Sequence, residues 1–362
     1  MFCNIYHNKR VLVTGHTGFK GSWLCAWLKT LGADVCGLSL PLETIPAHSE
    51  LLKTNLRNEI CDIRDASNVK KILVNFQPDI VFHLAAQPIV RLSYDDPVGT
   101  FASNVMGTAN VLEACRHASS IKAIVVISSD KCYENREQLW GYRETDPMGG
   151  YDPYSASKGC AELVVSSFRS SFFNPVDYGV KHNTLLASAR AGNVIGGGDW
   201  AKDRLVPDLI RNAKENKVTE IRNPCSTRPW QHVLEPLSGY LALGAKLLQG
   251  ETGFAEGWNF GPGDGGVVTV DAAAKMLAKH WDSIRFIVNP PQEQPHEAGL
   301  LSLDCTKARY RLNWQATLNT DEAFEWTAIW YKEYYEHNRL LTLKQLEDYV
   351  KIAIDRGLEW TN

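Results

Sequence analysis

The chain has 362 residues, a length that suits one large domain or two unequal domains sharing an interface. Its hydrophobic share of 44% and charged share of 22% are those of a globular protein, and the net charge of −3 argues against a general nucleic-acid binder. No stretch approaches the roughly 20 apolar residues that cross a membrane, and the start MFCNIYHNKRVLVTG lacks a signal-peptide core, so we expect a cytoplasmic protein.

The first half of the chain alternates aliphatic strands with helix-length amphipathic segments. RVLVTG leads into FKGSWLCAWLKTLG and ADVCGLSL, and further on DIVFHLAA, PVGTFASNVMGTANVLEACRHA and IKAIVVISS follow one another. Strands that are apolar throughout, separated by helices, indicate a parallel sheet covered on both faces. After about residue 190 the chain turns to loops rich in glycine, proline and tryptophan, a composition typical of ligand-binding loops.

The nine cysteines are scattered along the chain. There is no CxxC pair and no group of cysteines and histidines at zinc spacing. We therefore expect reduced thiols that act as small core residues, with no disulfide framework and no structural metal.

Three glycines stand between the first strand and the first helix. Gly15, Gly18 and Gly21 are three residues apart in VLVTGHTGFKGSWL. Glycine at such a turn lets the backbone approach a pyrophosphate, which the helix N-terminus then stabilises. In this strand–turn–helix context, the triplet favours a dinucleotide site over a purely structural turn.

A tyrosine and a lysine follow at helical spacing. Tyr154 and Lys158 in YDPYSASKGCAELV lie on one face of a helix. A phenol, with an ordinary pKa of about 10, is a poor base at neutral pH, but a nearby ammonium favours the phenolate. Tyr154 could therefore accept a proton from a sugar hydroxyl while hydride leaves the same carbon.

An acid and a base end the apolar run AIVVI. Ser129, Asp130 and Lys131 should lie at the carboxyl edge of the sheet, where ligands of open α/β folds bind. Alcohol oxidation needs only serine, tyrosine and lysine, so the added pair suggests elimination of water beside a new ketone. Lys131 would act as a neutral base, its pKa depressed by burial or by Lys158, or remain cationic and stabilise an enolate. A surface ion pair at a strand end is the structural alternative.

The GxxGxxG spacing after Thr14, together with YSASK, resembles the extended short-chain dehydrogenase/reductase superfamily. The resemblance implies NAD as cofactor, because CDIRD matches the pair at the adenine ring and HLAAQ the loop beneath the cofactor. The residues it assigns to NAD are Gly15, His16, Gly18, Phe19, Gly21, Ser39, Asp62, Ile63, Ala85, Ala86, Tyr154 and Lys158.

Two of these positions depart from the pattern of the superfamily. Ser39 stands where NAD-binding members usually have an acid for the ribose hydroxyls, and His16 fills a site that is usually small. We therefore expect NAD to be held loosely. No arginine near Ser39 suggests a 2′-phosphate site, which favours NAD over NADP.

Within the superfamily, the chain resembles the nucleotide-sugar 4,6-dehydratases. Members acting on dTDP-glucose carry Thr-Asp-Glu at positions 129–131, whereas the Ser-Asp-Lys of this chain resembles the CDP-glucose branch. The likeness runs over nearly the whole length, including GHTGFKG, SSDKCYE, YSASK and EAGLLSLDCTKA. It implies conversion of CDP-D-glucose to CDP-4-dehydro-6-deoxy-D-glucose plus water, with hydride passing from C4 to C6 through NAD. It also implies a homodimer formed by the helices near residues 100–116 and 155–172.

The same resemblance assigns the contacts to the nucleotide sugar. Asn193 in ARAGNVIGGGDW matches the asparagine that lies against the substrate phosphates, and Arg228 in STRPWQHVLE matches the arginine that clamps the pyrophosphate. The guanidinium fork suits phosphate better than a point charge does. Arg204 in DRLVP and His296 in PHEAG are further candidates, for which an ordinary surface or capping role weighs equally.

We therefore predict an α/β fold, a Rossmann-like doubly wound parallel sheet with a smaller α/β substrate-binding region. Residues 1–190 would form the NAD-binding domain, with residues 231–262 returning to it. Residues 191–230 and 263–335 would form the substrate-binding region, and residues 336–362 a helical tail.

Two rival functions stay open at this point. A 4-epimerase, or a dehydratase for another nucleotide, shares most of these motifs, although epimerisation needs no acid–base pair at Asp130 and Lys131. A non-catalytic NAD-binding sensor would be favoured by loss of Tyr154 or Lys158, and both are present. The preference for cytidine over thymidine rests on the resemblance alone.

Overall fold

The computed structural model describes residues 1–263, 265–289 and 299–362. Its centre is a parallel seven-stranded sheet in the order β11-β6-β5-β4-β1-β2-β3. The strands are β1 Arg10–Thr14, β2 Asp34–Ser39, β3 Arg57–Ile60, β4 Ile80–His83, β5 Ala123–Ile127, β6 Leu185–Ala191 and β11 Gly257–Phe260. The prediction of a doubly wound parallel sheet is confirmed.

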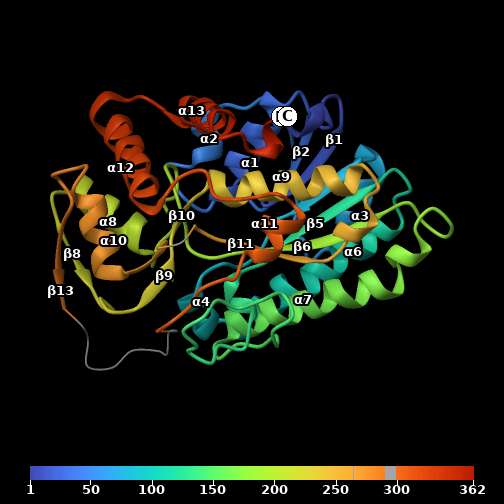
Figure 1. The fold of residues 1–362 in the computed structure, drawn as a ribbon, viewed down its shortest axis with the longest axis horizontal. Coiled ribbons are helices and arrows are strands. Elements are labelled where there is room, and N and C mark those ends of the chain that lie inside the picture. Colours follow the sequence, from blue (N-terminus) through green and yellow to red (C-terminus); the bar gives the residue numbers. More distant parts are fainter. Residues whose placement is uncertain (264, 290–298) are drawn as a thin grey trace.

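Helices cover both faces of this sheet (Figure 1). The main ones are α1 Phe19–Thr30, α3 Ala66–Phe76, α6 Gly107–Arg116, α7 Pro153–Ser171, α9 Leu234–Leu248 and α13 Thr342–Asp355. Alternate residues of β1 divide between the two cores, with Val11 and Val13 facing α1 and α9 and Leu12 facing α3 and α6. A strand buried on both faces has no polar side, which explains why the strands of this sequence are apolar throughout.

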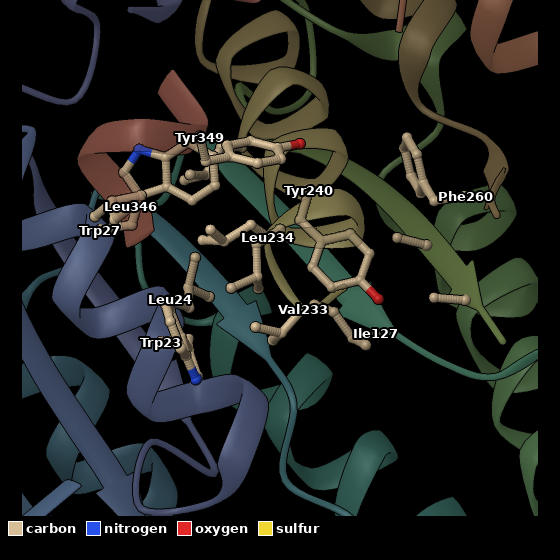
Figure 2. Packing of buried hydrophobic residues seen from close by; sticks show 14 of the residues in the cluster. Trp23, Leu24, Trp27, Ile127, Val233, Leu234, Tyr240, Phe260, Leu346 and Tyr349 are labelled. Atoms are coloured by element: carbon tan, nitrogen blue, oxygen red, sulfur yellow. The ribbon is translucent and has the colours of Figure 1, made fainter. Parts of the chain in front are cut away.

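Large aromatic side chains fill the core between α1, α9 and α13, as Figure 2 shows. Trp27 of α1 meets Tyr349 of α13 edge-on, with ring centroids 5.8 Å apart. Tyr240 of α9 meets Phe260 of β11 in the same way at 5.8 Å. The helix α13, near the C-terminus, therefore packs on α1 and belongs to the same core.

A second group of elements lies at one end of the sheet (Figure 1). Its elements are β7 Val194–Ile195, α8 Leu205–Lys214, β8 Val218–Ile221, β9 Thr227–Pro229, β10 Gln231–His232, β12 Val267–Thr269, α10 Val270–Ala278, β13 Arg285–Val288 and α12 Thr320–His337. Three small sheets join β7 to β10, β8 to β13 and β9 to β12. Between these segments the chain returns to the central sheet, where β11 pairs with β6.

Short helices complete the described chain. They are η1 Phe2–Asn4, α2 His48–Leu52, α4 Val90–Asp95, α5 Pro97–Phe101, η2 Ala102–Met106, η3 Asp130–Cys132, η4 Pro175–Asp177, η5 Thr252–Phe254, α11 Thr306–Arg311 and η6 Glu359–Thr361.

In the described part of the chain, no helix has the length and apolarity needed to cross a membrane. All nine cysteines carry free thiols.

A buried carboxylate joins α9 to the C-terminal part of the chain. Glu235 is 1% exposed and accepts the backbone N–H groups of Thr317 at 2.8 Å and Leu318 at 2.7 Å. It also accepts the hydroxyl of Tyr349 at 2.9 Å. Burial raises the pKa of Glu235 to about 7. The two carboxylate oxygens thus satisfy two backbone donors that would otherwise be buried without partners.

We predict that Glu235→Gln lowers the free energy of unfolding by about 1–3 kcal/mol. Glutamine keeps the size of the side chain but turns one acceptor into a donor that faces a backbone N–H. Urea unfolding above neutral pH measures the loss. The matched control is Glu251→Gln, which breaks the partly exposed pair between Glu251, just beyond the same helix, and Lys246 and should change stability by less than about 0.5 kcal/mol. Equal losses in the two variants would contradict the prediction.

Candidate active site

A cavity of about 650 Å³ opens at the carboxyl ends of the central strands. Its walls come from the loops that follow β1, β2, β3, β4, β5 and β6, joined by residues of α8 and β8. Parallel strands all end at one edge of the sheet. The neighbouring strands β1 and β4 are followed by connections that run in opposite directions, to β2 and to β5, so a crevice forms between them where the strand order reverses.

The glycine turn forms the floor of this cavity. Gly15 has φ +72°, and a Cβ added there would lie 2.8 Å from the backbone nitrogen of Ala85. A Cβ on Gly21 would lie 2.1 Å from the carbonyl oxygen of Gly15. The Thr14 hydroxyl accepts the N–H groups of Leu84 and Ala85, both at 3.1 Å, and so joins the ends of β1 and β4. Side chains are excluded here, and the backbone is left open to a ligand.

The imidazole of His16 lies outside the cavity. Its ring is buried against β2, where a Cβ on Gly37 would come within 2.2 Å of the His16 Cγ, and His16 does not line the cavity. Burial lowers the pKa of His16. Ser39 does line the cavity and accepts the Thr17 hydroxyl at 3.0 Å. The expectation of a loosely held cofactor therefore rests on Ser39, because the His16 ring does not crowd the site.

The other residues assigned to the cofactor line the same cavity. They are Gly15, Gly18, Phe19, Gly21, Ser39, Asp62, Ile63, Ala85 and Ala86. Arg64 engages the carboxylate of Asp62 at 2.6 Å and thereby lowers the pKa of Asp62. A backbone turn without side chains, with Asp62 and Ile63 in the same cavity, fits the pyrophosphate and the adenine end of a dinucleotide.

The five candidate catalytic residues meet in this cavity: Ser129, Asp130, Lys131, Tyr154 and Lys158. The Ser129 hydroxyl donates to Oδ1 of Asp130 at 3.0 Å and accepts the N–H of Lys131 at 3.2 Å. The side chain of Ser129 is also close enough to Tyr154 to lower the pKa of Tyr154, against the larger effect of burial. Oδ2 of Asp130 is buried and has no hydrogen-bond partner among the described residues.

Burial favours the neutral form of three of these groups. It raises the pKa of Asp130, although Lys131, Ser129, Arg228 and Lys20 all oppose the shift. It raises the pKa of Tyr154 to about 12 and lowers that of Lys158 to about 8. Asp130 is therefore suited to hold and donate a proton, and Lys158 changes charge close to neutral pH.

The start of α7 fixes the position of Tyr154. Asp152 caps the helix by accepting the N–H of Ser155 at 2.9 Å, and proline occupies the first helical position. The Ser93 hydroxyl accepts the N–H of Tyr154 at 3.1 Å. Asn104, in the π-helical turn η2, donates to the Ser157 hydroxyl of α7 at 2.8 Å. Tyr154 is thus held in the first turn of a capped helix.

Three of the four residues assigned to the nucleotide sugar line the cavity. They are Asn193, Arg204 and Arg228. Arg204 donates to Oδ2 of Asp199 at 3.0 Å, and Arg228 is buried close enough to Asp130 to affect its pKa. The fourth residue, His296, lies outside the described residues.

Sequence reasoning missed three cations that line the cavity: Lys20, Arg91 and Arg222. Burial lowers the pKa of Lys20 to about 8, and Lys158 and Arg204 add to the shift. Lys20 had a local signal, since it stands between two glycines of the turn. Arg91 and Arg222 had no such signal in the sequence. They come together only in the folded chain, where they lie 3.7 and 3.8 Å from the carboxylate of Asp203.

Comparison with known proteins identifies the class to which this fold and site belong. The sequence profile of the GDP-mannose 4,6 dehydratase family matches residues 12–327, so the chain belongs to this family of nucleotide-sugar dehydratases. In particular, it is 49% identical over 351 residues to the CDP-glucose 4,6-dehydratase of Salmonella typhimurium, covering 96% of this chain and 98% of that relative. The resemblance to the dehydratase branch is confirmed.

Two solved structures share the fold. One is DesIV, a dTDP-glucose 4,6-dehydratase from Streptomyces venezuelae with NAD and TYD bound, at 22% identity and a TM-score of 0.74 over 90% of this chain and 97% of that one. The other is MoeE5 in complex with UDP-glucose and NAD, at 25% identity and a TM-score of 0.73 over 90% and 99%.

We predict that Gly37→Ala destabilises the protein by about 1–3 kcal/mol, because the new methyl group would occupy the space of the His16 ring. His16→Ala in the same chain should restore most of the loss. Urea unfolding of the two single variants and the double variant gives the interaction energy. Additive losses would show that the ring does not fill the space left by Gly37.

Proposed function

We propose that this protein converts CDP-D-glucose to CDP-4-dehydro-6-deoxy-D-glucose and water, as a hydro-lyase that uses NAD. The observation that carries the proposal is the meeting of two catalytic sets in one cavity. Ser129, Tyr154 and Lys158 suit oxidation of an alcohol, and Asp130 with Lys131 suits elimination of water. The near-full-length similarity to a CDP-glucose 4,6-dehydratase supports the choice of cytidine.

NAD suits the glycine side of the cavity. Gly15 and Gly21 would leave room for its pyrophosphate, with Asp62 and Ile63 beside the adenosine and Ala85 beneath it. NAD bound there would supply a hydride acceptor for C4 of the sugar and a hydride donor for C6, so the reaction would have no net redox change. The presence of NAD and UDP-glucose together in MoeE5 supports this arrangement.

Tyr154 and Ser129 carry the oxidation in our proposal. Ser129, which is close enough to Tyr154 to affect its pKa, would bind the 4-hydroxyl of the sugar, and Tyr154 would take the proton of that hydroxyl. Burial works against the phenolate, because it raises the pKa of Tyr154 to about 12. A protonated Lys158 one helical turn away would offset this effect by stabilising the phenolate.

Asp130 and Lys131 carry the elimination. The ketone at C4 acidifies the proton on C5, which Lys131 would remove as a base, or whose loss it would assist by stabilising the enolate. Asp130 would protonate the 6-hydroxyl through Oδ2, which has no other partner among the described residues. The C5–H and C6–O bonds would break, a C5–C6 double bond would form, and water would leave. Addition of hydride at C6 then requires a proton at C5, which Lys131 would return. The raised pKa of Asp130 suits this role as an acid.

The substrate diphosphate would lie on the cationic side of the cavity. Arg228 and Arg204 offer guanidinium groups there, and Asn193, in the loop after β6, lines the same cavity. These fixed donors suit phosphate oxygens. A 4-epimerase would need the same contacts, but it would leave Asp130 and Lys131 without a role.

We also propose a homodimer and a two-part organisation. The helices expected at the dimer interface expose apolar side chains, with Met106 57% and Leu163 59% exposed. Residues 1–190 and 231–262 would form the NAD-binding domain, because β11 joins its sheet. Residues 191–230 and 263–335 would bind the nucleotide sugar.

The reaction is tested with a set of nucleotide sugars labelled with deuterium at C4. We expect the highest kcat/KM with CDP-glucose among the CDP-, dTDP-, UDP- and GDP-sugars, and we expect the label to reappear at C6 of the product. Mass spectrometry locates the label, and the 4-keto product is assayed directly. A higher kcat/KM with dTDP-glucose would overturn the assignment of cytidine. Loss of the label to solvent would rule out internal return of hydride.

The division of labour is tested with Lys131→Met and Tyr154→Phe. Methionine keeps most of the apolar stem but neither accepts a proton nor stabilises an enolate, so dehydration should fall by roughly 10²–10⁴. Oxidation should continue, and the absorbance of reduced nicotinamide should rise on rapid mixing with substrate. Tyr154→Phe should block hydride transfer and give no such absorbance. Near-normal dehydration by Lys131→Met would show that Asp130 and Lys131 form only a structural ion pair.

A further inference from the structure

The loop that carries Asp130 and Lys131 is bound to the core through Tyr133. Tyr133 is 1% exposed, and its hydroxyl donates to Oδ1 of Asn259 at 2.7 Å. The same hydroxyl accepts a hydrogen bond from Nη1 of Arg190, also at 2.7 Å. Arg190 lies on β6 and Asn259 on β11, the two strands beyond β5 in the sheet. The loop that leaves β5 is therefore bound by its neighbouring strands.

Arg190 is itself held in one orientation. Its Nε and Nη2 atoms donate to the two carboxylate oxygens of Glu162 at 3.0 and 2.9 Å. The side chains of this ion pair are 6% and 4% exposed, and the Ser188 hydroxyl donates to Glu162 at 2.7 Å. Although burial opposes ionisation, Arg190 holds the pKa of Glu162 below its ordinary value. A buried pair with this many hydrogen bonds stays charged and fixes the nitrogen that faces Tyr133.

Asn259 is equally constrained. The side-chain nitrogen Nδ2 of Asn259 donates to the backbone carbonyl oxygens of Tyr142 at 2.8 Å and Asp304 at 3.2 Å, which leaves Oδ1 facing the Tyr133 hydroxyl. The ring of Tyr133 stacks on that of Tyr142, with centroids 5.3 Å apart and an interplanar angle of 15°. The Tyr133 hydroxyl is thus fixed by a donor and an acceptor that cannot move independently.

We propose that Tyr133 is a positioning residue for the elimination step, and this proposal rests on the proposed function. Its hydroxyl fixes the short helix η3, and with it Asp130 and Lys131, at a set distance from the sugar. Tyr154 and Lys158 lie on α7, whose first turn is held by the cap at Asp152. The Tyr133 hydroxyl bonds Asn259 and Arg190 on the sheet, so its loss should disturb η3 more directly than the first turn of α7. Its loss should therefore slow elimination more than oxidation.

The test is Tyr133→Phe, which removes the hydroxyl and keeps the ring stacked on Tyr142 and beside Arg190. We expect dehydration to fall roughly 10- to 100-fold, as for a small displacement of a catalytic group. Reduced nicotinamide should accumulate during turnover, as in Lys131→Met but to a lesser extent, and the KM for substrate should stay close to that of the wild type.

The matched control is Tyr349→Phe. This tyrosine is as deeply buried, and its hydroxyl bonds Glu235 at 2.9 Å and Ser238 at 3.2 Å, in contacts that do not involve η3. Its loss should lower the melting temperature without any accumulation of reduced nicotinamide. If both variants accumulate it, or if neither does, Tyr133 has only a structural role.

A second variant keeps the proposal testable if Tyr133→Phe folds poorly. Arg190→Lys retains a cation beside Glu162 but removes the guanidinium nitrogen that reaches Tyr133, and it should show the same accumulation. Loss of turnover without reduced nicotinamide in either variant would overturn the proposal. Failure of the proposed function would be distinct, because the wild type itself would then form no 4-keto product from any nucleotide glucose.

Discussion

All strands of the central sheet run in one direction, and the rest of the structure depends on this constraint. Parallel pairing requires that the chain cross back over the sheet after each strand, which places a helix on one face or the other. It also brings every carboxyl-end loop to the same edge. The glycine turn after β1, the pair Asp130 and Lys131 after β5 and Asn193 after β6 are far apart in sequence and line one cavity for this reason.

Burial then determines the chemistry of that cavity. Asp130, Tyr154 and Lys158 all lie where charge is poorly solvated, and the pKa of each moves toward its neutral form. The same physical effect gives them different roles, because a carboxylic acid that keeps its proton can donate it, whereas an ammonium that loses its proton readily changes charge near neutral pH. The surrounding cations oppose only part of the shift at Asp130.

The supports of the site are as specific as the site itself. Thr14 joins the ends of β1 and β4 beside the glycine turn, and Asp152 begins the helix that carries Tyr154. Next to the Tyr133 hydroxyl, the ion pair of Arg190 and Glu162 is buried with nearly all its hydrogen bonds made, so its desolvation is offset and its geometry is rigid. A reaction that oxidises one carbon and eliminates water across the next two needs both sets of groups held in fixed relation.

The sequence alone determined the parallel sheet, the glycine turn and the identity of the five candidate catalytic residues. These follow from short-range patterns: apolar runs separated by helices, glycines three apart, and Tyr154 and Lys158 one helical turn apart. Only the tertiary structure decided that the His16 ring packs against Gly37 and that Arg91 and Arg222 reach the cavity. It also decided that Tyr133 bonds Arg190 and Asn259, which lie 57 and 126 positions further along the chain. Such contacts depend on strand order and on which face of an element each side chain occupies, and no local periodicity encodes either one.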